Sequence, residues 1–344
     1  MTDFTPDRYS PSIVSVTDKV KPVALGMAVT SAHFRKERVA FVGAEENVAL
    51  VGAQGEISNV AVHSGGILST ASDGKQLVMG GDDGKVVSLD AKGEVALLAT
   101  DSKRRWIDAV ALHSDGAFAW SAGKTAFVQP AKDKNKEPRQ FEAPSTVGGL
   151  AFLPKGFRLA IAHYNGATLW FPNAAQAAPE RFEWKGSHLG ITVSPDGRFL
   201  VTSMQEPMLH GWRLVDGQHM RMSGYSWRVL SLGWTVGGRF LATSGATQII
   251  LWPFHTKDGP MGKQPRLLAP SEHRVSKVAC HPTQEIVAAG YDDGMVLLVR
   301  MEDGAEILAR RPGQGPITAL NWSADGLFLA FGTEGGEAGI IDLR

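Results

Sequence analysis

Short apolar runs separated by polar turns repeat along the chain. Within residues 67–99, apolar runs at 67–71, 76–80, 85–89 and 94–99 alternate with turns rich in Asp and Gly. Runs of this length with many β-branched residues are typical of strands, and Asp-Gly pairs provide the positive φ angles of tight hairpins. No segment carries a helical period of useful length. The pattern therefore predicts units of four short antiparallel strands.

The turn before the second strand of each unit recurs at nearly constant spacing. Its glycine falls at positions 74, 116, 156, 197, 238 and 326, and degenerate copies lie at 32–37 and 280–284. A period of roughly 41 residues with four strands is typical of a β-propeller, in which each repeat forms one blade of a ring. First strands are expected near positions 27, 67, 107, 147, 189, 229, 275 and 317. This predicts eight blades, with seven as the alternative if one terminal unit is irregular.

The last unit ends after its third strand, at Arg344. An unassigned β run, 13–16, precedes the first unit. We therefore expect the N-terminal strand to join the C-terminal blade, which would close the ring and remove exposed strand edges. The predicted organisation is a flexible tail over residues 1–10 and one all-β propeller over residues 11–344.

Over roughly residues 11–344 the sequence resembles the WD40-repeat family, with degenerate repeats. In the second unit the turn 82–84 precedes a third strand that ends in Leu89-Asp90, where the family has Trp-Asp. Elsewhere the family's Trp position is kept without the Asp, and histidines precede some first strands, near the family's Gly-His position. The matching residues are Trp170, Trp212, Trp252, His63, His188 and His273. At these positions we expect the tryptophans to pack inside the blades.

Composition and charge narrow the possible partners. Lys plus Arg and Asp plus Glu number 35 each, so the formal net charge is zero. A nucleic-acid-binding protein normally carries a basic excess, and nucleic acid is therefore not the expected partner. The single Cys280 cannot form an internal disulfide. The chain starts with a polar segment and has no apolar stretch typical of a signal peptide or a membrane span, so we expect a cytoplasmic protein with no membrane partner.

No catalytic or cofactor motif is present, and we predict no catalytic residue and no cofactor. A metal-handling accessory protein that binds zinc or copper is an alternative function. Its ligands would come from loop histidines or from a cluster of soft ligands at 204–222. However, no metal-ligand spacing supports such a site, and methionines at alternating strand positions usually fill cores. The residues in question are His63, His163, His188, His273, Met204, Met208, His210, His219, Met220 and Met222.

Arginines and aromatic residues gather in loops that a propeller would place on one face. These loops join a fourth strand to the next first strand, or a second strand to a third. Arg, Trp and Tyr anchor many protein interfaces, although each could instead cap its own blade. The predicted partner-binding residues are Arg104, Arg105, Trp106, Tyr164, Trp227, Arg228, Arg274 and Tyr291. We therefore expect a non-enzymatic scaffold that binds a protein or peptide, with an acidic segment as the target. A third class of function would be an enzyme that acts in the central channel.

Overall fold

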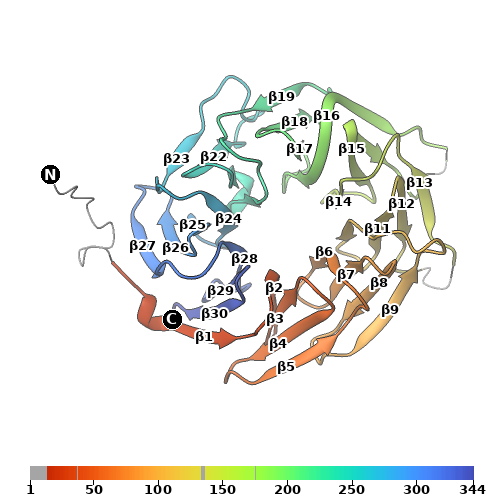
Figure 1. Cartoon of the computed structure of the whole chain (residues 1–344). Coiled ribbons are helices and arrows are strands. Elements are labelled where there is room, and N and C mark those ends of the chain that lie inside the picture. The colour runs from red at the N-terminus through yellow and green to blue at the C-terminus, as the bar shows by residue number, and fades with distance from the viewer. Residues whose placement is uncertain (1–13, 37, 133–135, 175) are drawn as a thin grey trace.

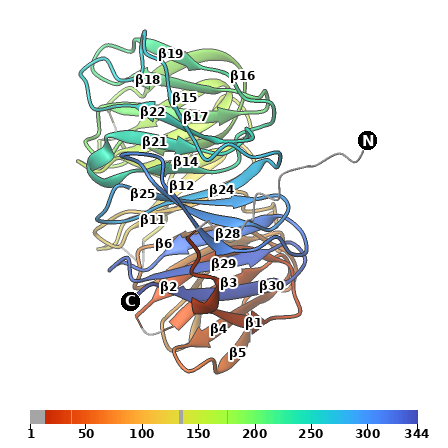
Figure 2. The ribbon, with the colours of Figure 1, turned by 90° about the vertical axis from the view of Figure 1, so that its left-hand side faces the viewer.

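The computed structural model describes residues 14–36, 38–132, 136–174 and 176–344. Within these residues, thirty strands, β1 to β30, are arranged around a central axis, and two short 3-10 turns, η1 (Thr17–Lys19) and η2 (Val236–Gly238), are the helical segments. Figure 1 shows the ring along its axis, and Figure 2 shows it from the side. The protein is thus a single all-β propeller, as predicted. The predicted tail, residues 1–10, lies outside the described residues.

Four-stranded antiparallel sheets make up most of the ring. In each, the strands follow one another from the inside of the ring to the outside (Figure 1). The first three are β2 (Val29–Arg35), β3 (Arg38–Gly43), β4 (Asn47–Gly52) and β5 (Ile57–Ala61); β6 (Ile67–Ser72), β7 (Leu77–Gly81), β8 (Lys85–Leu89) and β9 (Val95–Thr100); and β10 (Val110–Leu112), β11 (Phe118–Ala122), β12 (Thr125–Gln129) and β13 (Arg139–Glu142).

Two further four-stranded sheets lie between the six-stranded sheet described below and the chain's C-terminal sheet. They are β20 (Leu232–Trp234), β21 (Phe240–Thr243), β22 (Ile249–Pro253) and β23 (Arg266–Leu268); and β24 (Val275–Cys280), β25 (Ile286–Tyr291), β26 (Val296–Arg300) and β27 (Glu306–Arg310).

One sheet has six strands, and it changes the predicted blade count. It comprises β14 (Gly149–Phe152), β15 (Leu159–Trp170), β16 (Glu180–Val193), β17 (Phe199–Met204), β18 (Leu209–Arg213) and β19 (His219–Met222). The first half of β16 pairs with β15, whereas its second half, from His188 onward, pairs with β17. The described residues therefore form seven hydrogen-bonded sheets, and the prediction of eight separate blades is wrong. The physical reason is that β16 continues without a loop from one sequence repeat into the next.

Both ends of the chain contribute to the last sheet. β28 (Ile317–Trp322), β29 (Phe328–Thr333) and β30 (Glu337–Asp342) are completed on the outside by β1 (Val20–Ala24), which pairs antiparallel with β30. The prediction that residues 13–16 take this role is therefore wrong, and the strand lies several residues further along the chain. In the described part of that run, Ser15 instead forms a parallel bridge to Leu308 of β27. Ile13 lies outside the described residues.

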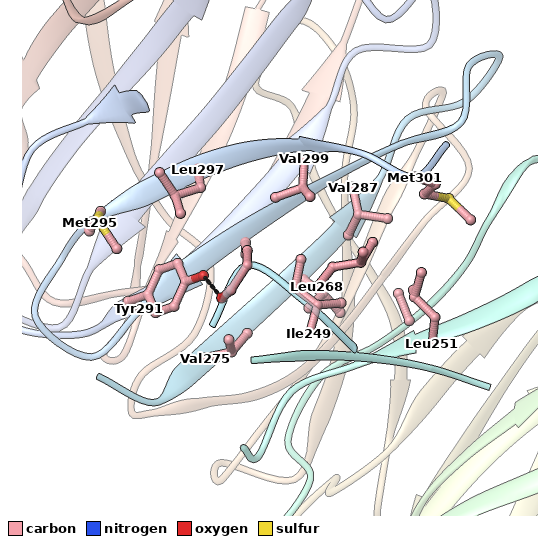
Figure 3. Close-up of a cluster of buried hydrophobic side chains, with 14 of the residues drawn as sticks. Ile249, Leu251, Leu268, Val275, Val287, Tyr291, Met295, Leu297, Val299 and Met301 are labelled. Atoms are coloured by element: carbon pink, nitrogen blue, oxygen red, sulfur yellow. Dashed lines mark hydrogen bonds between the residues drawn. The ribbon is translucent and has the colours of Figure 1, made fainter. Parts of the chain in front are cut away.

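The core lies between neighbouring repeat units. Eight clusters of buried side chains are present among the described residues, and each combines side chains from two consecutive units. In the cluster of Figure 3, Ile249 and Leu251 of β22 pack against strands β25 and β26. Another cluster joins Val23 and Ala330 of the last sheet to Phe41 of β3. Trp212 and Trp252 are buried, which confirms their predicted role in packing.

Candidate partner-binding face

Two sets of loops come together at one end of the strands. The backbone N–H of Asp101 donates to Gly84 O at 2.8 Å, and that of Trp227 donates to Gly245 O at 3.0 Å. Asp292 N–H likewise donates to Arg274 O at 2.9 Å. Each bond links a loop that leads into a first strand with a turn between second and third strands. These bonds bring the two kinds of loop together at one end of the strands.

The loop before β10 contains three predicted site residues with different surroundings. Asp101 is buried, and its carboxylate accepts hydrogen bonds from Arg105 Nη2 at 2.7 Å and from the backbone N–H of Arg105 at 2.9 Å. The hydrogen bond from the Arg105 side chain outweighs burial and lowers the pKa of Asp101. Arg105 therefore holds the loop in shape. Arg104 and Trp106 are exposed, with 61% of Trp106 accessible to solvent.

The loop before β20 contributes a more continuous patch. Trp227 is 41% exposed and has the guanidinium of Arg274 over its ring, 5.9 Å from the centroid. The exposed Arg228 donates from Nη1 to Gln205 Oε1 at 2.9 Å, which links this loop to the turn between β17 and β18. Leu230, in the same loop, is 60% exposed. We call these five residues the Trp227 patch.

The other predicted residues lie apart from this patch. Tyr164 is exposed at the turn within β15, where Gly166 has a φ of +140°. A Cβ at Gly166 would lie 2.1 Å from Phe182 O, so the close approach of the two backbones requires glycine. Trp106 belongs to a loop several units away from Trp227. The predicted residues therefore follow the ring, and only Trp227, Arg228 and Arg274 are brought together.

Tyr291 is wrongly predicted as a surface residue. It is fully buried at the end of β25, and its hydroxyl donates to Ala269 O at 2.8 Å. Figure 3 shows its ring among Val275, Met295 and Leu297. Because Tyr291 directly precedes an Asp-Asp-Gly turn, the sequence pattern predicts that it lies in a loop. The strand, however, extends through Tyr291, and its side chain faces the neighbouring sheet, where a buried hydroxyl needs a partner.

Several cations of this face are neutralised locally. Arg274 Nε lies 3.7 Å from Asp292 Oδ2, and Arg310 forms an ion pair with Glu337. Asp83 accepts hydrogen bonds from the Ser64 N–H and from His63 Nδ1. Burial raises the pKa of Asp83, but these hydrogen bonds outweigh it and lower the pKa to about 2. The face is therefore of mixed charge, and the Arg228 side chain donates to the neutral amide of Gln205.

The histidines considered as metal ligands take part in packing and hydrogen bonding. His188 is buried between Thr202 Oγ1 and Trp184 O, and burial lowers its pKa. His210 stacks on Trp184 with 4.1 Å between ring centroids, and burial lowers its pKa to about 3. Met204, Met220 and Met222 are buried, the latter two in a core cluster.

In the described part of the chain, no group of three His, Cys, Asp or Glu residues could hold a metal ion. The structure thus gives no support to the metal-handling alternative. Nor does any helix in the described part have the length and apolar character needed to cross a membrane.

Leu230 and Gln205 were missed by the sequence analysis. Leu230 lies in an apolar run that predicts a buried first strand, yet β20 begins only at Leu232. No sequence signal separates an exposed leucine at the mouth of the ring from a buried one. Gln205 belongs to the patch only because its side chain accepts a hydrogen bond from Arg228.

Comparisons with known proteins agree with this architecture. A family model described as the anaphase-promoting complex subunit 4 WD40 domain matches residues 278–344. Among solved structures, the computationally designed Ika8 protein superposes with a TM-score of 0.74 at 17% sequence identity, covering 93% of this chain and 98% of that chain. At this identity the likeness shows the fold alone. No curated protein matches the chain. The match to residues 278–344 agrees with the resemblance of the sequence to the WD40-repeat family.

Proposed function

We propose that this WD40-repeat propeller is a non-enzymatic cytoplasmic scaffold that binds a protein or peptide through the Trp227 patch. The observation that carries the proposal is the exposed Trp227 ring with the guanidinium of Arg274 over it, next to the exposed Arg228. Exposed aromatic and Arg side chains that gather on one face are typical of protein interfaces. The surrounding sheets fix the loop, so little ordering is needed on binding.

The charge of the patch supports an acidic segment as the target. Arg228 is exposed and donates to an uncharged side chain, so its guanidinium can still form a bidentate pair with a carboxylate. Arg274, by contrast, already has Asp292 nearby. An acidic residue next to an apolar one would place its carboxylate at Arg228 and its apolar group against Trp227 and Leu230.

We also propose that the ring is closed by the pairing of β1 with β30, as the sequence pattern predicts for an N-terminal strand. A buried cluster that joins Val23 and Ala330 of the last sheet to Phe41 of β3 supports this closure.

The test replaces Trp227 and Arg228 together with Ala in the full chain. Partners are recovered by affinity capture from the source cells and quantified by mass spectrometry, and the main partner is then titrated in purified form. Truncation of an interface anchor costs about 2 kcal/mol or more, so we expect at least a tenfold loss of affinity. Raising the salt concentration should weaken binding by the wild-type chain, because the Arg228 pair is near the surface.

Two control variants make the outcome specific. Val215, which is 86% exposed, lies in the turn between β18 and β19 on the opposite face, and Val215→Ala should bind normally. The variant Trp106→Ala tests whether the loop before β10 belongs to the same interface. Full binding by the Trp227→Ala, Arg228→Ala double variant, with an unchanged melting temperature, would exclude the Trp227 patch.

A further inference from the structure

The wall of the central channel contains a cavity that shares one lining residue, Leu230, with the Trp227 patch. Four first strands, β2, β20, β24 and β28, surround about 450 Å³. These strands belong to the sheets that lie on either side of the junction between the chain ends (Figure 1). Polar side chains from three of the strands reach the cavity: Ser31, His33, Lys277, Cys280 and Asn321.

Lys277 gives this cavity a positive charge. It is the only Lys or Arg among the lining residues, and no Asp or Glu is among them. Lys277 is partly buried, and burial lowers its pKa, with no carboxylate among the described residues near enough to offset this effect. A desolvated ammonium without an anionic partner is costly, because the lost hydration is not replaced. An anion in the cavity would supply the missing partner.

Hydrogen-bonding groups on the neighbouring strands complement the charge. His33 Nε2 lies 3.1 Å from Ser31 Oγ and 3.2 Å from Thr70 Oγ1. Because these hydroxyls can donate to Nε2, the ring proton can reside on Nδ1 and be donated to a ligand. Asn321 Nδ2 donates one hydrogen to Ala32 O at 2.9 Å, which orients the amide and leaves its second hydrogen for a ligand.

The surrounding cations do not compete for the same role. Arg35 lies on β2, as His33 does, but its guanidinium donates hydrogen bonds to Leu89 O and Lys75 O. Burial, together with the charges of Arg35 and Lys277, lowers the pKa of His33 to about 4. The imidazole is therefore neutral near pH 7, and Lys277 alone supplies charge to the cavity.

We propose that this part of the channel binds a small oxyanion, a carboxylate or a phosphate, as an ion pair with Lys277 and with hydrogen bonds from His33 and Asn321. The ammonium offers three donors, and the two neutral donors lie on β2 and β28, which are neighbouring first strands. This inference does not depend on the proposed scaffold function, because Leu230 is the one residue that both the Trp227 patch and the lining of this cavity contain, and Lys277, His33 and Asn321 do not belong to the patch.

Thermal unfolding of the full chain tests the proposal. Inorganic phosphate and acetate are titrated separately against chloride at equal ionic strength and pH. We expect one of them to raise the melting temperature in a saturable way, as a ligand of the native state does. In Lys277→Met this shift should be lost, while the variant in chloride should be at least as stable as wild type. Lys92→Met, at an exposed turn, should keep the shift.

A second measurement needs no variant. Lysine modification by formaldehyde and a borohydride reductant is followed by mass spectrometry with and without the effective anion. Lys277 should be modified more slowly when the anion is bound, whereas Lys92 should react equally in both conditions. The proposal is overturned if neither anion gives a saturable shift, if Lys277→Met keeps the shift, or if Lys277 reacts at the same rate in both conditions.

Discussion

In this propeller, two tyrosines at similar sequence positions have different surroundings: one is part of the core and the other is exposed. Tyr291 and Tyr164 both stand next to turns between a second and a third strand. Tyr291 is buried and donates its hydroxyl to Ala269 O, whereas Tyr164 is 57% exposed. Residue type and sequence position are therefore insufficient to assign either residue. What decides is whether the strand continues through the residue with its side chain directed at the neighbouring sheet.

Replacing Tyr291 with Phe should lower the free energy of unfolding by about 1 kcal/mol, and by up to about 3 kcal/mol if Ala269 O is left without a donor. Tyr291→Ala should cost about 3–5 kcal/mol because it also leaves a cavity. Urea unfolding measures both. Tyr164→Phe is the matched control and should leave stability unchanged. Equal stability of Tyr291→Phe and wild type would show that the buried hydrogen bond contributes nothing.

At the scale of elements, β1 has two roles in the last sheet. It pairs with β30 along five residues, and its Val23 packs with Val29 and Phe41 of the first complete sheet. The exposed residue Pro22 lies on the same strand, which fits an edge strand because proline cannot donate to a ladder on either side. β1 thus protects the outer edge of β30 and contributes to the contact between the first and last units.

Val23→Asp should destabilise the protein by about 3 kcal/mol or more, because a carboxylate would be placed among apolar side chains with no partner. Ala24→Asp is the control, since Ala24 is exposed on the same strand. Denaturant midpoints and the rate of proteolysis near β1 are the measurements. If Val23→Asp melts like Ala24→Asp, β1 is not needed to hold the last sheet in place.

The sequence predicts the strands of this fold well, but it predicts less well how one repeat unit is connected to the next. The strands near 67–99 and the burial of Trp212 and Trp252 follow from turn spacing and apolar runs. The continuity of β16 does not, because 180–193 contains the polar link Lys185-Gly186-Ser187, which is typical of a loop. The N-terminal strand of the last sheet is Val20–Ala24 rather than 13–16, and the apolar pattern misses it because Lys21 and Pro22 are residue types that are depleted in strands. The Trp227 patch depends on contacts between distant loops, which no local pattern encodes.

At the scale of the whole molecule, the buried clusters link each unit to the next around the ring, and the pairing of β1 with β30 is proposed to close it. Each cluster among the described residues joins two neighbouring units, and one joins the last unit to the first. In an open repeat array, terminal units can unfold separately because they have one neighbour. In a closed ring every unit has two neighbours, so losing any unit exposes two apolar faces.

We therefore expect the protein to unfold in one cooperative transition. Far-UV circular dichroism and tryptophan fluorescence should give the same denaturant midpoint. Leu251→Ala, in the cluster of Figure 3, should lower the free energy of unfolding by about 2–5 kcal/mol and shift both probes together with an unchanged m-value. Leu77→Ala, in the cluster between β2–β5 and β6–β9, should do the same from another part of the ring. If fluorescence in Leu251→Ala falls before the dichroism, the damaged units unfold on their own, and the ring does not act as one unit.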